Sequence, residues 1–338
     1  MAFISNCTAD VIAKAAQALK DGHLVAFPTE TVYGLGADSQ SADAVAKIYK
    51  AKGRPADHPL IVHVSSMDAL GDWASDVPGY AIALAREFWP GPMTLVVKRS
   101  ELAKDFVTGG QDTVGVRVPE HVVALALLQQ FERNGGRGVA APSANRFGAV
   151  SPTTASAVED ELADHLSADD LVLDGGASQV GVESTIVDCT GSTPRLLRLG
   201  AVTVEMIEAA SGLGVVGFSE KSEIRVSGSL ESHYAPKAKV ILNAAAQPGE
   251  GLIAMADMET PAGVIRLAAP RSTDEYASIL YSSLREADSQ GLSKVFAIEP
   301  QGDGLAEAIR DRLTRAAYGP GSTSANRPKV RYSSELKG

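Results

Sequence analysis

The feature that most constrains the fold is a repeated order of a short apolar strand, a polar or glycine-containing end, and then an amphipathic helix. The first strand, Leu24–Phe27, runs into Pro28-Thr29-Glu30-Thr31 and then into Gly34 and Gly36. Polar residues at the end of a buried strand, with glycines that let a ligand approach the backbone, are typical of a binding site. The alternation of strands with helices predicts an α/β fold.

Two further strands have an apolar face and a polar face. Alternation within residues 58–64 and 112–119 predicts that their valines face a core, while His63, Thr113 and Arg117 face the other way. Taken singly, a histidine such as His63 is more often a satisfied core residue, and an arginine such as Arg117 is more often solvated. Taken together, these polar groups favour a small-ligand cleft.

Residues 41–52 predict a helix that begins behind Ser41 and ends at Gly53. Lys52 then lies in the last turn and Arg54 just beyond it, so both cations are able to reach one anion. On its own, a lysine in a last turn is more often a complement to the helix dipole. We expect this helix end to be exposed, so that alanine at either cation costs the fold little.

A fourth strand, in residues 138–148, delivers Ser143 and Asn145 at its end. At this point the motifs together resemble the YrdC-like family of L-threonylcarbamoyladenylate synthases, over roughly residues 8–205. The motifs are PTETVYGLG, Lys52-x-Arg54, FWPGPMTLVV, VGVRVP, APSAN, SPTT and GVESTIVD. The later His233-Tyr234-Ala235-Pro236 and the chain after it resemble the long, two-domain form of that enzyme.

The resemblance implies that L-threonine, bicarbonate and ATP give threonylcarbamoyl-AMP and pyrophosphate, the first step in modifying an adenosine of certain tRNAs. The product would pass to a tRNA threonylcarbamoyl transferase complex, so no direct tRNA binding is required. Mg²⁺ would accompany ATP, with no other metal site and no organic cofactor.

The resemblance also implies a role for each matching residue. The expected catalytic residues are Lys52, Arg54, Ser143 and Asn145. The expected ATP contacts are Arg54, His58, Thr113, Ser143, Ser151, Arg198 and Tyr234. The expected threonine contacts are Thr31, His63, Arg117, Ala141 and Ser184. His58 departs from the family pattern, which more often has Asn before Pro-Leu. The assignment of an ATP contact to His58 is therefore the least direct of these.

Two alternatives remain open for a domain of this type. One is an RNA- or nucleotide-binding module that makes no adenylate, and the other is a carbamoyl-adenylating module within a larger hydrogenase-maturation enzyme. Residues 1–210 carry 16 Lys and Arg against 26 Asp and Glu, a net charge of −10, which disfavours binding of a phosphate backbone. The two cysteines, Cys7 and Cys189, are too few for the zinc-finger-like segments of the second alternative.

The chain also predicts its own organisation. We expect a YrdC-like domain with a twisted, concave sheet at 1–208, a Gly- and Ser-rich linker at 209–237, and a smaller Rossmann-like domain at 238–338. Because Tyr234 lies in the linker, its contact with ATP requires the linker to fold back as a lid; otherwise Tyr234 only anchors the linker to the second domain. Without a long apolar run or a signal-like N-terminus, a cytoplasmic protein without a membrane partner is expected.

Two further patterns are expected to be coincidences. Gly212–Gly217 fits G-x-G-x-x-G but follows a predicted helix and opens none, whereas a dinucleotide site needs a strand before it and a helix after it. Ser324-Ala325-Asn326-Arg327 repeats the letters of residues 143–146 without a preceding apolar strand.

Overall fold

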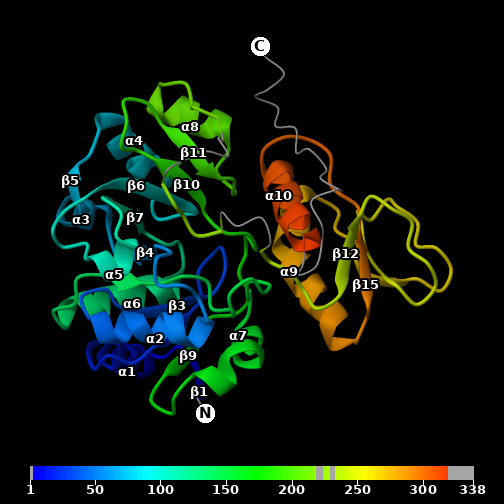
Figure 1. Ribbon diagram of the computed structural model, residues 1–338, viewed down its shortest axis with the longest axis horizontal. Coiled ribbons are helices and arrows are strands. Elements are labelled where there is room, and N and C mark those ends of the chain that lie inside the picture. Colours follow the sequence, from blue (N-terminus) through cyan, green and yellow to red (C-terminus); the bar gives the residue numbers. More distant parts are fainter. Residues whose placement is uncertain (1–2, 218–223, 229–232, 319–338) are drawn as a thin grey trace. The chain divides into compact units, whose positions relative to one another are not determined.

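The computed structural model describes residues 3–217, 224–228 and 233–318, which fall into two compact units (Figure 1). The first unit lies within residues 1–229 but leaves out 148–151 and 180–182. These two short segments belong, with residues 230–338, to the second unit. The expected α/β class is confirmed in both units. The domain limits expected at residues 208 and 238 stay a prediction.

The first unit is built on one mixed sheet of parallel and antiparallel pairs. In spatial order its strands are β1 (Phe3–Asn6), β9 (Leu171–Asp174), β2 (Val25–Phe27), β3 (Gly34–Asp38), β8 (Val139–Ala140), β4 (Ile61–His63), β7 (Thr113–Arg117), β6 (Met93–Arg99), β10 (Thr185–Asp188) and β11 (Arg195–Arg198), with β5 (Ala74–Asp76) paired to β6.

Helices connect these strands, and the longer ones are those that apolar periodicity predicts. They are α1 (Ala9–Lys20), α2 (Ala42–Lys52), α3 (Leu70–Trp73), α4 (Gly79–Phe88), α5 (Asp105–Thr108), α6 (Val122–Arg133), α7 (Ala155–Leu162) and α8 (Val204–Ser211), with 3₁₀ turns η1 (Met67–Ala69) and η2 (Ala163–His165). The predicted cap of α2 is confirmed, since the Ser41 side chain accepts from Ala44 N and Gly53 is left-handed at φ 62°.

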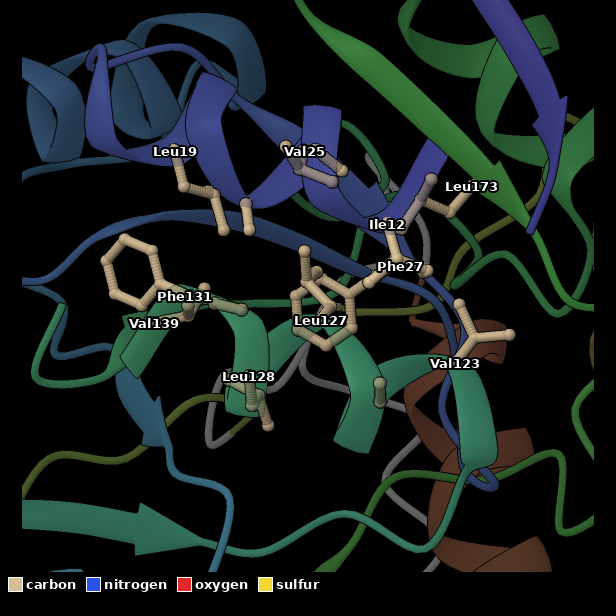
Figure 2. Close-up of a cluster of buried hydrophobic side chains, with 14 residues drawn as sticks. Ile12, Leu19, Val25, Phe27, Val123, Leu127, Leu128, Phe131, Val139 and Leu173 are labelled. Carbon is tan, nitrogen blue, oxygen red and sulfur yellow. The ribbon is translucent and has the colours of Figure 1, made fainter. Parts of the chain in front are cut away.

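One hydrophobic core joins helices α1 and α6 to strands β2 and β8 (Figure 2). Leu19 of α1 and Leu127 and Phe131 of α6 are fully buried in the same cluster as Phe27 and Val139 of the sheet. Burying side chains of this size contributes roughly 1.5–3 kcal/mol each. This core therefore holds in place the ends of β2 and β8, from which the Thr29–Thr31 and Ser143–Asn145 segments leave.

Strands β4 and β7 are parallel neighbours, and their register matters most for the site. Ile61 pairs with Gly115, and His63 pairs with Arg117. Because successive residues of a strand point to opposite faces, these four residues share one face of the sheet. Val62 and Val116 point the other way and are fully buried, as alternation predicts.

The second unit has a parallel four-stranded sheet with strand order β12 (Lys239–Leu242), β15 (Lys294–Ala297), β13 (Gly251–Ile253) and β14 (Ile265–Ala268). Helices α9 (Thr273–Ser289) and α10 (Leu305–Ala317) pack together, α9 beside β14 and α10 beside β12. The smaller α/β domain that the sequence predicts after the linker is confirmed.

The described residues also bear on two smaller expectations. Helix α8 ends at Ser211 and Gly212 is its left-handed C-cap, so the G-x-G-x-x-G pattern begins as a helix stop, as expected. The Ser324–Arg327 pattern lies outside the described residues. Within the part of the chain that the structure describes, no helix combines the length and the apolar character needed to cross a bilayer.

The turn after α5 provides a test of the fold. Gly109 has φ +62°, and a Cβ there would lie 2.3 Å from the backbone oxygen of Asp57. Gly110 has φ +78° with no atom within 4 Å of its would-be Cβ. Gly110→Ala should therefore cost only the left-handed penalty, about 1–2 kcal/mol, whereas Gly109→Ala should cost clearly more because the opposing atom is backbone. Urea unfolding of both variants measures the difference, and equal losses would contradict the close approach.

Candidate active site

Lys52 and Arg54 leave the end of α2 toward the interior of the first unit. Only 2% of Lys52 and 8% of Arg54 is exposed, so the expectation of an exposed helix end is wrong. Lys52 Nζ donates to the backbone oxygens of Ser143, at 2.6 Å, and of Asn145. Burial and then repulsion by Arg54 hold the pKa of Lys52 well below its usual value. Lys52 thus supports the backbone of Ser143–Asn145. No local pattern in residues 41–54 indicates this role.

The segment around Asn145 is fastened to α2 from its other side as well. Phe147 N donates to Lys52 O at 2.8 Å, and Arg146 Nη1 donates to Ala51 O at 2.9 Å. These donors satisfy carbonyls at the end of the helix, which otherwise have no partner within it. Asn145 is fully buried, and its Nδ2 donates to Arg146 O at 2.8 Å. The predicted Lys-x-Arg and Ser-x-Asn motifs are therefore in direct contact.

A buried ion pair orients Arg117. Its Nη2 donates to Glu30 Oε1 at 2.6 Å and to Thr31 Oγ1 at 2.9 Å, and its Nε donates to Gly91 O at 3.3 Å. The second Glu30 oxygen accepts from Glu120 N at 3.1 Å. Three of the five N–H groups of Arg117 are in use, whereas the two on Nη1 have no partner in the part of the chain that the structure describes. Arg117 therefore presents Nη1 as a fixed donor.

His63 lies beside this arginine and is also buried, with 4% of its surface exposed. Its ring packs edge-on to Phe27 at 5.8 Å between centroids. Burial, and then the charge of Arg117, lower the pKa of His63 to about 3. Its Nδ1 is buried and has no hydrogen-bond partner among the described residues. A buried polar atom without a partner is costly, so this nitrogen suits a hydrogen bond with a ligand.

Ser184 and Arg198 form a second polar group. Arg198 Nε donates to Ser184 O and its Nη2 donates to Ser184 Oγ, both at 2.9 Å. The Ser184 hydroxyl also lies 2.8 Å from Thr94 Oγ1. Sequence reasoning assigned Ser184 to threonine and Arg198 to ATP, and the two side chains are in contact.

A pocket lies on the β4–β7 face and contains about 300 Å³ of empty space, part of it open to solvent. Its apolar walls include Ile61, Val96 and Ile186, and Thr113 and Gly115 also line it. Residues 225–227 line the pocket too, although they are more than a hundred positions away in the chain from β4 and β7. Apolar walls with a few polar groups among them are typical of a small-ligand site.

Ser227 joins the pocket to two of the expected ATP residues. Arg54 Nη2 donates to Ser227 Oγ at 3.1 Å, and Arg198 Nη1 donates to Ser227 O at 2.9 Å. Two guanidinium groups, one just beyond α2 and one from β11, thus converge on one residue at the edge of an apolar pocket. This arrangement suits a ligand with an apolar part and an anionic part.

The remaining predicted residues are distributed more widely. His58 lies edge-on to Phe147 at 5.4 Å, and burial and then Arg54 lower its pKa. Ala141 is buried, and its N donates to Ile61 O at 2.9 Å. Ser151 belongs to the second unit. The next residue, Pro152, belongs to the first unit, and its oxygen accepts from Tyr33 N.

Tyr234 is buried within the second unit. Its ring stacks on Tyr281 at 5.5 Å, and Arg312 Cζ lies 5.2 Å from the ring centroid. Tyr234 adopts φ 60°, which is rare for a residue with a side chain. This packing matches the alternative in which Tyr234 anchors the linker, and its contact with ATP stays a prediction.

Sequence reasoning missed the roles of Glu30, Gln111 and Ser227. Glu30 belongs to the PTETVYGLG motif, so a carboxylate after a buried strand was a signal that an arginine partner was needed. Gln111 and Ser227 had no signal, because their partners lie 114 and 173 residues away. Both cysteines are free.

Two family models match the chain. A Sua5/YciO/YrdC model described as telomere recombination matches residues 17–200, and a model of the threonylcarbamoyl-AMP synthase C-terminal domain matches residues 202–318. Threonylcarbamoyl-AMP synthase of Pyrococcus abyssi is 39% identical over 90% of this chain and 93% of its own. The Bacillus subtilis synthase is 38% identical over 91% of this chain and 93% of its own.

A solved structure is similar over nearly the whole chain. The crystal structure of P. abyssi Sua5 complexed with L-threonine has a TM-score of 0.84 and 36% identity, and the match covers 93% of this chain and 97% of that one. These matches confirm the resemblance inferred from the motifs and cover both units.

His63 makes the stability of the first unit depend on pH. Because the folded pKa of about 3 lies below the ordinary 6.5, the unfolded chain binds more protons between these values. The free energy of unfolding should therefore be highest above pH 6.5 and should fall as the pH drops toward 3. His63→Gln should make this dependence shallower, and His165→Gln, at an exposed histidine, should not. Denaturant unfolding between pH 4 and 7.5 measures it, and parallel curves for His63→Gln and the wild type would contradict it.

Proposed function

The chain belongs to the family of two-domain threonylcarbamoyl-AMP synthases and is such an enzyme, and we propose how its residues perform the reaction. In this proposal the first unit joins L-threonine, bicarbonate and ATP into threonylcarbamoyl-AMP and releases pyrophosphate. The L-threonine complex of the P. abyssi relative supports threonine as a substrate. The product then passes to enzymes that modify tRNA, with no direct tRNA contact required of this chain.

The register of β4 and β7 carries the proposal. Ile61 and Gly115 line the pocket that we assign to ATP, and His63 and Arg117 lie two residues further along the same strands on the same face. Two residues of a strand span about 7 Å. A threonine held at His63 and Arg117 would thus have its amino group within reach of an α-phosphate that extends from the pocket.

In the threonine site, the substrate carboxylate binds Nη1 of Arg117 and the substrate hydroxyl donates to Nδ1 of His63. Glu30 keeps the arginine oriented, and Thr31 lies against it. Ser184 and the Ala141 backbone complete this side of the site. The amine reacts with bicarbonate to form a carbamate and water, and a carbamate oxygen then attacks the α-phosphorus as pyrophosphate leaves.

In the ATP site, Arg54 and Arg198 bind the phosphates in place of Ser227, and Thr113 and His58 contact the nucleoside. Lys52 uses two N–H groups to hold the Ser143 and Asn145 oxygens, which leaves the third for a phosphate. An approaching polyanion favours the protonated form of Lys52 despite its burial. Transfer at phosphorus depends mainly on such positioning and charge neutralisation, so no covalent nucleophile is required.

Mg²⁺ fits this site as a companion of ATP. The side-chain oxygens of Ser143 and Asn145 are hard ligands of the kind Mg²⁺ accepts, and the described residues contain no group of three His, Cys, Asp or Glu that could hold a metal. The ion would therefore take most of its ligands from the phosphates and would neutralise part of their charge.

Ser151 and Tyr234 remain proposed ATP contacts, with the 209–237 linker as a lid over the nucleotide. We also propose a cytoplasmic location.

Threonine- and bicarbonate-dependent release of pyrophosphate from ATP tests the proposal. Arg54→Ala should lower this rate about 100-fold or more, because a phosphate loses its charged partner. Lys52→Ala should do the same and should also destabilise the fold by about 2–3 kcal/mol, since two buried carbonyls lose their donor. Lys50→Ala is the matched control, because Lys50 is exposed in the same helical turn. Near wild-type rates in either site variant would refute the assignment.

Arg117→Lys should damage the use of threonine selectively. One ammonium cannot serve Glu30, Thr31, Gly91 O and a substrate carboxylate at once, as the guanidinium can. The apparent KM for threonine should rise at least about tenfold while the KM for ATP changes little. Arg133→Lys, at an exposed arginine, should change neither. Equal weakening of both ligands in calorimetry would instead assign Arg117 to the nucleotide or to the fold.

A further inference from the structure

Gln111 lines the pocket and holds the linker backbone through both atoms of its amide. Its Oε1 accepts from Arg225 N at 2.7 Å, and its Nε2 donates to Arg225 O at 3.0 Å. The same linker segment places Val226 in a small cluster with Val96, Ile186 and Leu197, and Ser227 against Arg54 and Arg198. The backbone of one linker residue, Arg225, therefore occupies the donor and the acceptor of an amide that lines the pocket.

The orientation of this amide is fixed by a third contact. Nε2 also donates to Thr108 O at 3.4 Å, so its two hydrogens point to two different carbonyls. Turning the amide over would bring Oε1 against the Thr108 oxygen, and two acceptors would repel each other. Gln111 therefore presents an acceptor at Oε1 and a donor at Nε2 in a set order.

The linker segment and a nucleotide cannot share the pocket. With residues 225–227 in position, Arg225 occupies both hydrogen-bonding atoms of the Gln111 amide, and Val226 packs on the apolar wall, so a base that pairs with Gln111 has to displace them. Arg54 and Arg198 are held by Ser227 in the same arrangement. Entry of ATP therefore shifts residues 225–227 and exposes the Gln111 amide and both guanidinium groups in one movement.

We propose that Gln111 is the residue that selects adenine, and this rests on the proposed function of the pocket as the ATP site. Adenine presents an amino donor at N6 beside a ring-nitrogen acceptor, the same order that Arg225 N and Arg225 O present to Gln111. Guanine presents an acceptor at O6 instead, which would oppose Oε1. A glutamine amide pairs with adenine in this bidentate manner in nucleic-acid recognition.

The test compares ATP with GTP. Pyrophosphate release with threonine and bicarbonate gives a KM for each nucleotide in the wild type and in Gln111→Leu. The ratio of the KM for ATP to the KM for GTP should rise about 5- to 150-fold in the variant, the discrimination of one bidentate pair, while the maximal rate with ATP changes little. A ratio of the two KM values within twofold of that of the wild type would overturn the proposal.

Arg225→Pro is the matched control, because proline removes the backbone N–H that pairs with Oε1 and leaves Gln111 itself intact. If Gln111 only retains the linker, neither variant changes the ATP-to-GTP ratio, because the linker competes equally with both nucleotides, and this result overturns the proposal. If it reads the base, Arg225→Pro leaves the ratio unchanged. Should the wild type release no pyrophosphate, the proposed function fails, and calorimetric binding of ATP and GTP to the same three proteins still decides the role of Gln111.

Discussion

The pairing of β4 with β7 is the constraint on which the candidate site depends. The register aligns Ile61 with Gly115 and His63 with Arg117, so the two strands carry a pocket wall and a polar pair on one face. A slip of one residue would turn all four to the opposite face. The valines on the opposite face are fully buried, and their burial resists such a slip. Packing on one side of the sheet thus stabilises the chemistry on the other.

Buried charge is the second organising factor. Arg117 and Glu30 are each 5% exposed at the side chain, and a lone buried charge of either sign would be strongly destabilising. The pair is retained together with Thr31, Gly91 O and Glu120 N, which satisfy most of its hydrogen bonds. Lys52 has carbonyl partners instead of a carboxylate, and burial, followed by the charge of Arg54, lowers its pKa. The two cations therefore lie in different environments. This difference suits the proposed roles, in which Arg117 is held in a fixed orientation for a carboxylate and Lys52 is protonated when a phosphate approaches.

The linker segment 224–228 has an unusual position for a connection that sequence alone would treat as a spacer. It supplies Val226 to a buried cluster and Ser227 to two arginines of the first unit. Tyr234, six residues after Gly228, is buried among Tyr281 and Arg312 of the second unit instead. The linker therefore contacts each unit through different side chains. Val226 and Ser227 contact the lining of the pocket in the first unit, whereas Tyr234 packs among aromatic and arginine side chains of the second unit.

The sequence by itself determined the elements and the family. Capping Ser41, Gly53 and apolar periodicity predicted α2, alternation predicted the faces of β4 and β7, and the ordered motifs predicted a threonylcarbamoyl-AMP synthase, because all of these signals lie between near neighbours in the chain. Only the tertiary structure decided that Lys52 is buried on the Ser143–Asn145 backbone, that Glu30 holds Arg117, and that Gln111 and Arg54 bind the linker. Those contacts join residues 87 to 173 positions apart, and periodicity carries no information about which distant segments pack together.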